Sequence, residues 1–219
     1  MSTTDEAATD TLAVYSDYVC PFCYLGKAAM EQYLATADDP PTVEWRFYDL
    51  RGYKRDESGE IDHDVDDGKD DDYFEQARKN VERLKEEYDV EMTLDFSRDV
   101  DSWNAQQAAL YLRRNYGEET FLAFHEAVFA ALWEDGRDVG DPDVLAEIAE
   151  HVDFPEGTDV DPDEVRAAVE DPDREAVLRE TFEQAQQAGV RGIPTFVYEG
   201  HAARGAIPPE QLRRLIEGS

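Results

Sequence analysis

Cysteine is nearly absent from this sequence, which contains two such residues, Cys20 and Cys23, three positions apart. Proteins that depend on disulfides for stability need several cysteine pairs, so a disulfide-rich scaffold is excluded. A zinc site built from two cysteine pairs is excluded as well, because the second pair is missing. One short segment therefore has to account for the cysteine chemistry of this chain.

Positive charge is also scarce. The chain has 53 acidic residues against 21 lysines and arginines, and its net charge is −32. Such a charge repels nucleic acids and anionic lipids, so both are excluded as partners. The content of 41% hydrophobic and 11% aromatic residues favours a folded protein over a disordered one. We interpret the charge as a solvated surface and hypothesise adaptation to high salt, where repulsion is screened; the chain has only five lysines, which is compatible with this.

Long hydrophobic runs are missing too. No run of about 18 apolar residues occurs, so we expect no membrane-spanning segment. Residues 1–10 are polar and acidic, without the basic and apolar regions of a signal peptide, and are expected to be a flexible N-terminus. We therefore expect a cytoplasmic protein, in which a Cys-x-x-Cys pair cycles between thiol and disulfide.

The two cysteines occur where a strand pattern changes to a helix pattern. Residues 12–15 form an apolar run typical of a buried strand, and apolar residues then recur at helical spacing over 25–34. The pair thus lies at a predicted helix N-terminus, where free N–H groups and the helix dipole favour a thiolate at Cys20. Pro21 suits the first helical position, which needs no N–H. We expect Cys20 to be the nucleophile and Cys23 the resolving cysteine.

Other roles for the pair stay open but are less consistent with the sequence. A structural disulfide between these positions would close a very small loop and add little stability. A zinc site would need two more ligands, yet the histidines show no paired ligand spacing. An inert buried pair is the third alternative. We expect redox chemistry that uses neither a cofactor nor a metal.

The middle of the chain reads mainly as helices. A strand is predicted at 43–48, where apolar and polar residues alternate, and the acidic segment 56–72 is interpreted as a solvated loop. The alternative for this loop is a cation site, although the glycine and glutamate of a calcium loop are absent. Apolar residues at helical spacing predict helices within these ranges: 74–88, 105–112, 121–132 and 144–149.

The tripeptide Asp-Pro-Asp occurs three times, beginning at Asp141, Asp161 and Asp171. Each copy precedes a helical pattern, so we predict that the first aspartate is the N-cap and the proline the first helical residue. The C-terminal part is predicted to contain, in order, a helix over 172–188, a strand from Pro194 to Tyr198, a turn over 199–203, a strand starting at 204–206 and a helix over 209–217.

Three segments together resemble the DsbA-like thioredoxin family: residues 16–27 around the cysteines, residues 136–139, and residues 189–196. The branch that the sequence resembles most is the FrnE-like group, whose relatives include 2-hydroxychromene-2-carboxylate isomerases. Members of this family often carry Asn-Ser and Ala-His where this chain has Asp101-Ser102 and Ala105-Gln106. The resemblance extends over nearly the whole chain.

The resemblance implies an α/β fold, namely a thioredoxin fold with an all-helical insertion domain. The thioredoxin-like domain would comprise residues 11–55 and 171–219, and residues 56–170 would form the acidic loop and the helical insertion. It also implies a cis peptide bond between Ile193 and Pro194, which brings the Ile193 backbone beside Cys20 for an extended substrate to pair with. Arg191 would be the charge nearest to the redox pair. The residues expected to bind substrate are Pro21, Phe22, Ile193, Pro194 and Thr195.

Two functions follow from the resemblance. The first is a thiol-disulfide oxidoreductase that exchanges disulfides with protein substrates and with a redox partner. The second is a small-molecule isomerase or thiol-conjugating enzyme that uses the cleft between the domains. The Cys20 and Cys23 pair favours the first, because glutathione-dependent relatives of the second type typically have serine at the first position and lack the second cysteine.

Overall fold

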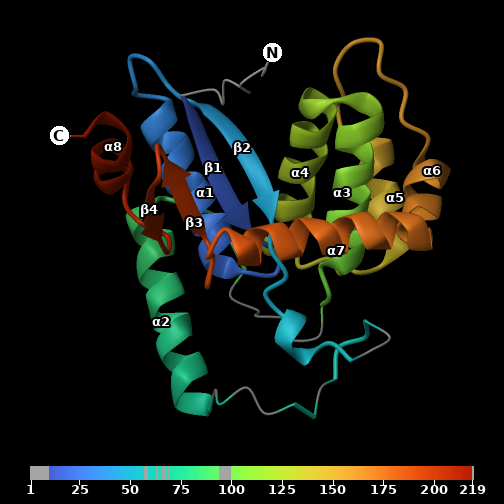
Figure 1. The fold of residues 1–219 in the computed structure, drawn as a ribbon, viewed down its shortest axis with the longest axis horizontal. Coiled ribbons are helices and arrows are strands. Elements are labelled where there is room, and N and C mark those ends of the chain that lie inside the picture. The colour runs from blue at the N-terminus through green and yellow to red at the C-terminus, as the bar shows by residue number, and fades with distance from the viewer. Residues whose placement is uncertain are drawn as a thin grey trace, which may run out of the picture.

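The computed structural model describes residues 10–56, 59–62, 64–65, 68, 70–93 and 100–218. Residues 1–9 of the expected flexible N-terminus, and six positions of the acidic segment 56–72, lie outside the described residues. Figure 1 shows a sheet with its helices on the left, a group of helices on the right, and one long helix that connects them across the front. The expected α/β fold with added helical content is therefore confirmed.

The sheet has four strands in the order β2-β1-β3-β4: β1 (Thr11–Ser16), β2 (Thr42–Phe47), β3 (Thr195–Tyr198) and β4 (His201–Arg204). β1 and β2 are parallel and are connected through helix α1 (Pro21–Leu34). β3 runs antiparallel to both β1 and β4. Strands from the two ends of the chain thus share one sheet.

The β3–β4 hairpin corrects one expectation. We expected a turn over 199–203 and a strand from 204–206, but β4 already begins at His201. Glu199 and Gly200 both have positive φ angles, 46° and 78°, as a two-residue hairpin turn requires. The turn is therefore shorter than predicted.

Two more helices lie beside α1. They are α2 (Asp71–Glu87) and α8 (Pro209–Glu217), and both pack against α1. The Tyr88 hydroxyl, at the end of α2, donates to the Ala206 carbonyl at 2.8 Å, and Gln32 of α1 donates to the Tyr88 carbonyl at 2.6 Å. Although α2 falls within the segment expected to be the insertion, it contacts the sheet side of the molecule. The domain division itself stays a prediction.

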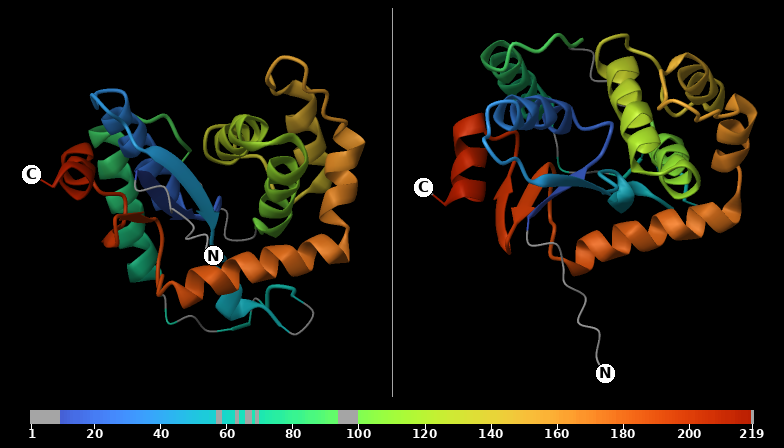
Figure 2. Two further views of the ribbon diagram at one scale, coloured as in Figure 1. Left: turned by 45° about the horizontal axis from the view of Figure 1, so that its top comes forward. Right: turned by 90° about the horizontal axis from the view of Figure 1, so that it is seen from above.

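The other helices form the group on the right of Figure 1, and the views in Figure 2 show α7 leading from this group back to the sheet. The group comprises α3 (Trp103–Tyr116), α4 (Glu118–Trp133), α5 (Pro142–His151) and α6 (Pro162–Val169), and the long connecting helix is α7 (Pro172–Gln187). A short 3-10 turn, η1 (Gly52–Lys54), follows β2. Asp141, Asp161 and Asp171 cap α5, α6 and α7, each accepting the N–H two residues later, as predicted.

The helical group packs directly on the loop between β1 and α1. Tyr18 in this loop shares a hydrogen bond of 2.8 Å with His125 Nδ1 of α4, and its carbonyl accepts the Trp133 Nε1–H at 2.8 Å. His125 lies in an aromatic cluster with Trp45 and Phe129, where burial lowers its pKa well below the usual value. It is a neutral core residue. Among the described residues, no helix is long and apolar enough to cross a bilayer.

Candidate active site

The two cysteines lie at the N-terminus of α1. β1 ends at Ser16 and α1 begins at Pro21, so Cys20 is the N-cap of the helix. The Cys20 carbonyl accepts the N–H of Cys23 at 2.9 Å, which places the second cysteine in the first helical turn. Both cysteines are free and buried. The strand-helix junction predicted at this motif is therefore confirmed.

Burial determines the acid-base behaviour of Cys23, which is 1% exposed. Burial raises the pKa of its thiol well above the usual value, and a hydrogen bond with Cys20 raises it further. Cys23 is therefore protonated at neutral pH. Cys20 occupies the position before the helix, where the positive end of the helix dipole lies.

A loop from the other end of the chain closes over the cysteines. The Ile193-Pro194 bond is cis, as expected, and the Ile193 carbonyl oxygen lies 3.9 Å from Cys20 Sγ. The loop is held by two hydrogen bonds: Thr195 Oγ1 donates to the Gly192 carbonyl at 2.6 Å, and the Gly205 N–H donates to the Pro194 carbonyl at 2.8 Å. Residues more than 170 positions apart thus meet at one site.

The other residues expected to bind substrate have different surroundings. Pro21 and Phe22 are half-buried beside the cysteines, and Ile193 is half-buried on the loop. The Ile193 N–H has no hydrogen-bond partner in the part of the chain that the structure describes, so it is free for a substrate backbone. The Thr195 side chain is 5% exposed and its hydroxyl is engaged by Gly192, so it supports the loop. Their contact with substrate stays a prediction.

Gly26 allows α1 to approach the proline loop closely. A Cβ atom at this position would lie 3.0 Å from Pro194 Cγ and 3.3 Å from Phe196 Cζ. Contacts this short force neighbouring atoms to move, and both neighbours are buried in the core. The glycine therefore matters for its missing side chain, which the sequence indicated only by its place in the family motif.

A buried carboxyl group that the sequence did not single out lies beneath the cysteine loop. Asp17 accepts hydrogen bonds from the Ser102 hydroxyl and from the N–H groups of Leu50 (2.8 Å) and Val19 (3.2 Å). Burial raises its pKa to about 6, against the opposing effect of these hydrogen bonds. Its carbonyl accepts the Cys20 N–H at 3.2 Å, so Asp17 connects the redox loop to the start of α3.

Gln106 extends this network. Its amide nitrogen donates to Ser102 Oγ at 3.1 Å and to the Tyr48 carbonyl at 3.2 Å, while its Oε1 has no partner in the described structure. Gln106 is one of the positions where this chain departs from the residues frequent in the family it resembles, whereas Ser102 is a residue that the family often carries. That departure was the available sequence signal for the network.

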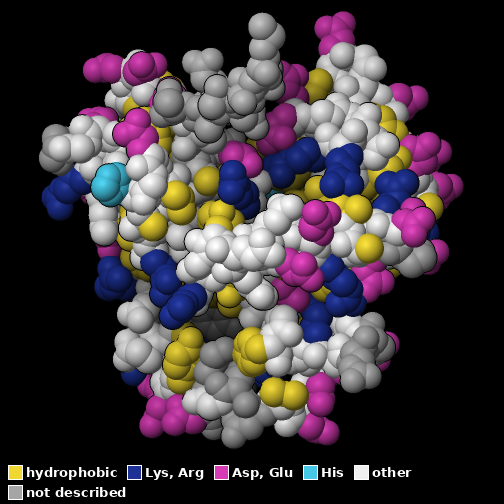
Figure 3. Space-filling view, viewed as in Figure 1, with side chains coloured by type: hydrophobic (Ala, Val, Ile, Leu, Met, Phe, Trp, Pro, Cys, Tyr) yellow, Lys and Arg dark blue, Asp and Glu magenta, His cyan; other side chains and the backbone are white. Residues whose placement is uncertain are grey.

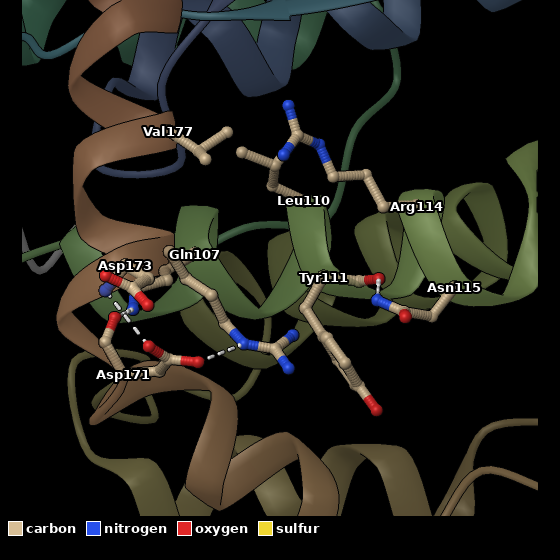
Figure 4. A pocket seen from close by; sticks show the side chains of 9 residues that line it. Gln107, Leu110, Tyr111, Arg114, Asn115, Asp171, Asp173 and Val177 are labelled. Carbon is tan, nitrogen blue, oxygen red and sulfur yellow. Dashed lines mark hydrogen bonds and ion pairs between the residues drawn. The ribbon is translucent and has the colours of Figure 1, made fainter.

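A separate pocket of about 370 Å3 lies between α3 and α7 (Figure 4). Gln107 of α3 connects this helix to α6 and to the start of α7, because its side-chain amide donates to the carbonyls of Ala168 (2.8 Å) and Asp171 (3.1 Å). None of the nine residues that line it belongs to the cysteine loop or the proline loop. In the described ranges, no group of three His, Cys, Asp or Glu side chains is arranged to hold a metal ion.

Comparisons with known proteins agree with this geometry. The model of the DsbA-like thioredoxin domain matches residues 11–217. The chain is 27% identical to the uncharacterized protein YwbO of Bacillus subtilis over 208 residues, 94% of each protein. It is similar in structure to a probable DsbA oxidoreductase from Streptomyces coelicolor (TM-score 0.73, 24% identity, covering 95% of this chain and 88% of that one). A 2-hydroxychromene-2-carboxylate isomerase is also similar in structure (TM-score 0.70, 15% identity, covering 95% and 93%). The chain belongs to the DsbA-like thioredoxin domain family.

Proposed function

We propose that this protein is a thiol-disulfide oxidoreductase that exchanges disulfides with protein substrates. The observation that carries the proposal is the meeting of two free thiols, one helical turn apart, with the carbonyl of Ile193 at 3.9 Å from Cys20 Sγ. Cys20 is the proposed nucleophile because it precedes α1. The raised pKa of Cys23 keeps that thiol protonated, so it does not compete as the attacking group.

In the reducing direction, the Cys20 sulfur attacks one sulfur of a substrate disulfide, whose S–S bond breaks and whose other sulfur leaves as a thiolate. Cys23 then loses its proton and attacks Cys20. The Cys20–Cys23 disulfide forms, the substrate leaves as a dithiol, and two electrons have passed to it. The same steps in reverse oxidise a substrate, and a redox partner returns the pair to its starting state.

The proline loop is proposed to position the substrate. The free N–H of Ile193 and its carbonyl beside Cys20 offer a hydrogen-bonding edge to an extended polypeptide. A protein segment with an exposed disulfide fits such an edge, because its main chain pairs while its sulfur meets Cys20. Localisation in the cytoplasm stays a prediction.

The test traps the reaction halfway. In a Cys23→Ser variant the mixed disulfide on Cys20 cannot be resolved, so incubation with a disulfide-bonded test protein at molar KCl should accumulate a covalent complex. Mass spectrometry should find the test polypeptide on Cys20, and dithiothreitol should release it.

Cys20→Ser is the matched control and should give no complex and no exchange. A Cys20→Ser variant that exchanges disulfides as fast as the unaltered protein would overturn the proposal. A small thiol on Cys20, found even when protein disulfides are in excess, would instead favour the small-molecule enzyme of the isomerase type.

A further inference from the structure

Most cationic side chains of this acidic protein have a carboxylate partner. In the described part of the chain, the side chains of four arginines make no hydrogen bond, ion pair or ring contact: Arg114, Arg191, Arg204 and Arg214. With 53 acidic residues against 21 basic ones, an arginine without a partner is unexpected. Two of these four lie beside the proposed substrate edge.

Both arginines are held next to the proline loop by the fold. Arg191 is exposed and precedes Ile193 by two residues. Arg204 ends β4 opposite Thr195 in the hairpin register. A Cβ atom at Gly192 would lie 3.5 Å from Arg204 Cδ and 3.7 Å from its Nε, so this side chain lies along the loop.

Tyr48 provides an independent sign of where the Arg204 charge lies. Burial raises the pKa of Tyr48, and the positive charge of Arg204 opposes this effect. Arg204 is thus near both the end of β2 and the proline loop. Figure 3 shows Lys and Arg side chains grouped at the edge of a hollow, on the face that carries the end of α7 and the β3–β4 hairpin.

We propose that Arg191 and Arg204 make this site select protein disulfides whose cysteine is flanked by aspartate or glutamate. This rests on the proposed oxidoreductase function. A guanidinium group binds a carboxylate through two parallel hydrogen bonds, and these two groups are exposed and unoccupied by any carboxylate of the described residues. A polypeptide paired with the Ile193 backbone presents its neighbouring side chains to them.

The net charge of the whole molecule opposes the approach of an acidic substrate, and the two arginines would offset this repulsion at the site. The net charge of −32 repels such a substrate, and at about 1 M salt this repulsion is screened beyond about 3 Å. Two local positive charges at the reacting edge act at contact distance, where screening is weakest. Selection by the two arginines therefore operates once the substrate has reached the surface.

The test compares rates of exchange for three disulfide-bonded peptides that differ only beside the cysteine, with Glu, Gln or Lys there. The unaltered protein should prefer the Glu peptide over the Gln peptide by about threefold to tenfold at one fixed salt concentration. The Arg191→Gln/Arg204→Gln variant should lose this preference, so that its rates with the Glu and Gln peptides become equal.

Arg114→Gln/Arg214→Gln is the matched control, because it removes the same charge from two other unpaired arginines and should keep the preference. Equal rates for the Glu and Gln peptides, or a preference that survives in the Arg191/Arg204 variant, overturn the inference and leave the oxidoreductase function standing. Preference for a small dicarboxylate disulfide, without one for the Glu peptide, overturns it in favour of a small anion. Failure to exchange with every peptide overturns the proposed function itself.

Discussion

Asp17 shows how a single buried residue can connect the redox loop with the rest of the molecule. Its side chain is 2% exposed and is bonded to Ser102 at the start of α3, while its carbonyl holds the Cys20 N–H. Burial makes the ionised carboxylate costly, which is why its pKa is raised to about 6. A group with a raised pKa binds its proton more tightly in the folded state than in the unfolded state.

The sign of the resulting pH dependence follows from this difference. Below about pH 4, Asp17 is protonated in both states and its contribution to stability is fully present; as the pH rises through about 6 that contribution is lost. The unaltered protein should therefore lose about 3 kcal/mol across this interval relative to Asp17→Asn, which has no proton to release. Urea unfolding of both proteins at several pH values measures the difference.

Asp153→Asn is the control for this experiment. Asp153 is exposed, so its replacement should leave the pH dependence of the free energy of unfolding parallel to that of the unaltered protein. Parallel curves for Asp17→Asn as well would show that the Asp17 carboxyl does not titrate differently in the folded state.

Single residues of the candidate site could be predicted from the sequence only where they belong to a short motif of neighbouring residues. Cys20, Cys23 and Pro194 stand out because their motifs are short, contiguous and placed at element boundaries. The bond between Asp17 and Ser102 joins positions 85 residues apart, and no pattern of spacing along the chain predicts such a contact. The closeness of Arg204 to Gly192 likewise depends on a hairpin whose turn was predicted to be too long.

At the scale of helices and strands, the Asp-Pro-Asp starts illustrate what sequence can predict well. An N-cap depends only on neighbouring residues. The aspartate side chain accepts an N–H of the first turn, and proline occupies the first helical position, where a backbone N–H would have no partner within the helix. Helix α2 is the counterexample. Its apolar residues at helical spacing predicted a helix correctly. Such a pattern does not show which element the apolar face packs against, and α2 packs against α1 instead of against α3–α6.

The capping role leads to a prediction for α6. Asp161 Oδ1 accepts the Asp163 N–H at 2.9 Å, so Asp161→Ala leaves this donor to water and should lower the free energy of unfolding by about 1 kcal/mol. Asp161→Asn should retain most of the stability, because asparagine also caps. Urea denaturation of the purified variants gives both values.

Glu156→Ala controls for the loss of one negative charge, since Glu156 is exposed and lies in the loop before α6. It should change stability by less than about 0.5 kcal/mol. An Asp161→Ala variant as stable as Glu156→Ala would show that the cap contributes nothing to this helix.

At the scale of the whole molecule, the helical group and the sheet share one apolar core that includes Cys20 and Cys23. Tyr18 and Trp133 join the two parts next to the cysteines, so the redox loop lies at their junction. The family resemblance predicted the thioredoxin fold with added helices, but not the place of the redox loop between the two parts, whereas composition alone predicted only a folded acidic protein. The net charge, by contrast, follows from the composition alone, because counting charged residues does not require knowing which residues are in contact.

The net charge of the protein predicts how its stability depends on salt. With a net charge of −32, the folded state suffers self-repulsion that reaches about 30 Å at 0.01 M salt, about 10 Å at 0.1 M and about 3 Å at 1 M. The free energy of unfolding should therefore rise at each step from 0.01 to 1 M KCl, as the hypothesis of salt adaptation requires. Urea is the suitable denaturant because it adds no ions.

A variant with less charge separates screening from other effects of salt. Glu82, Glu86, Glu156 and Glu183 are exposed and make no ion pair with the described residues. Replacing all four with glutamine should raise stability at 0.01 M KCl and reduce the further gain on reaching 1 M, because less repulsion is left to screen. If both proteins gain equally from salt, the gain comes from ion effects on apolar surface. If neither gains, repulsion does not limit this fold and the hypothesis of salt adaptation is wrong.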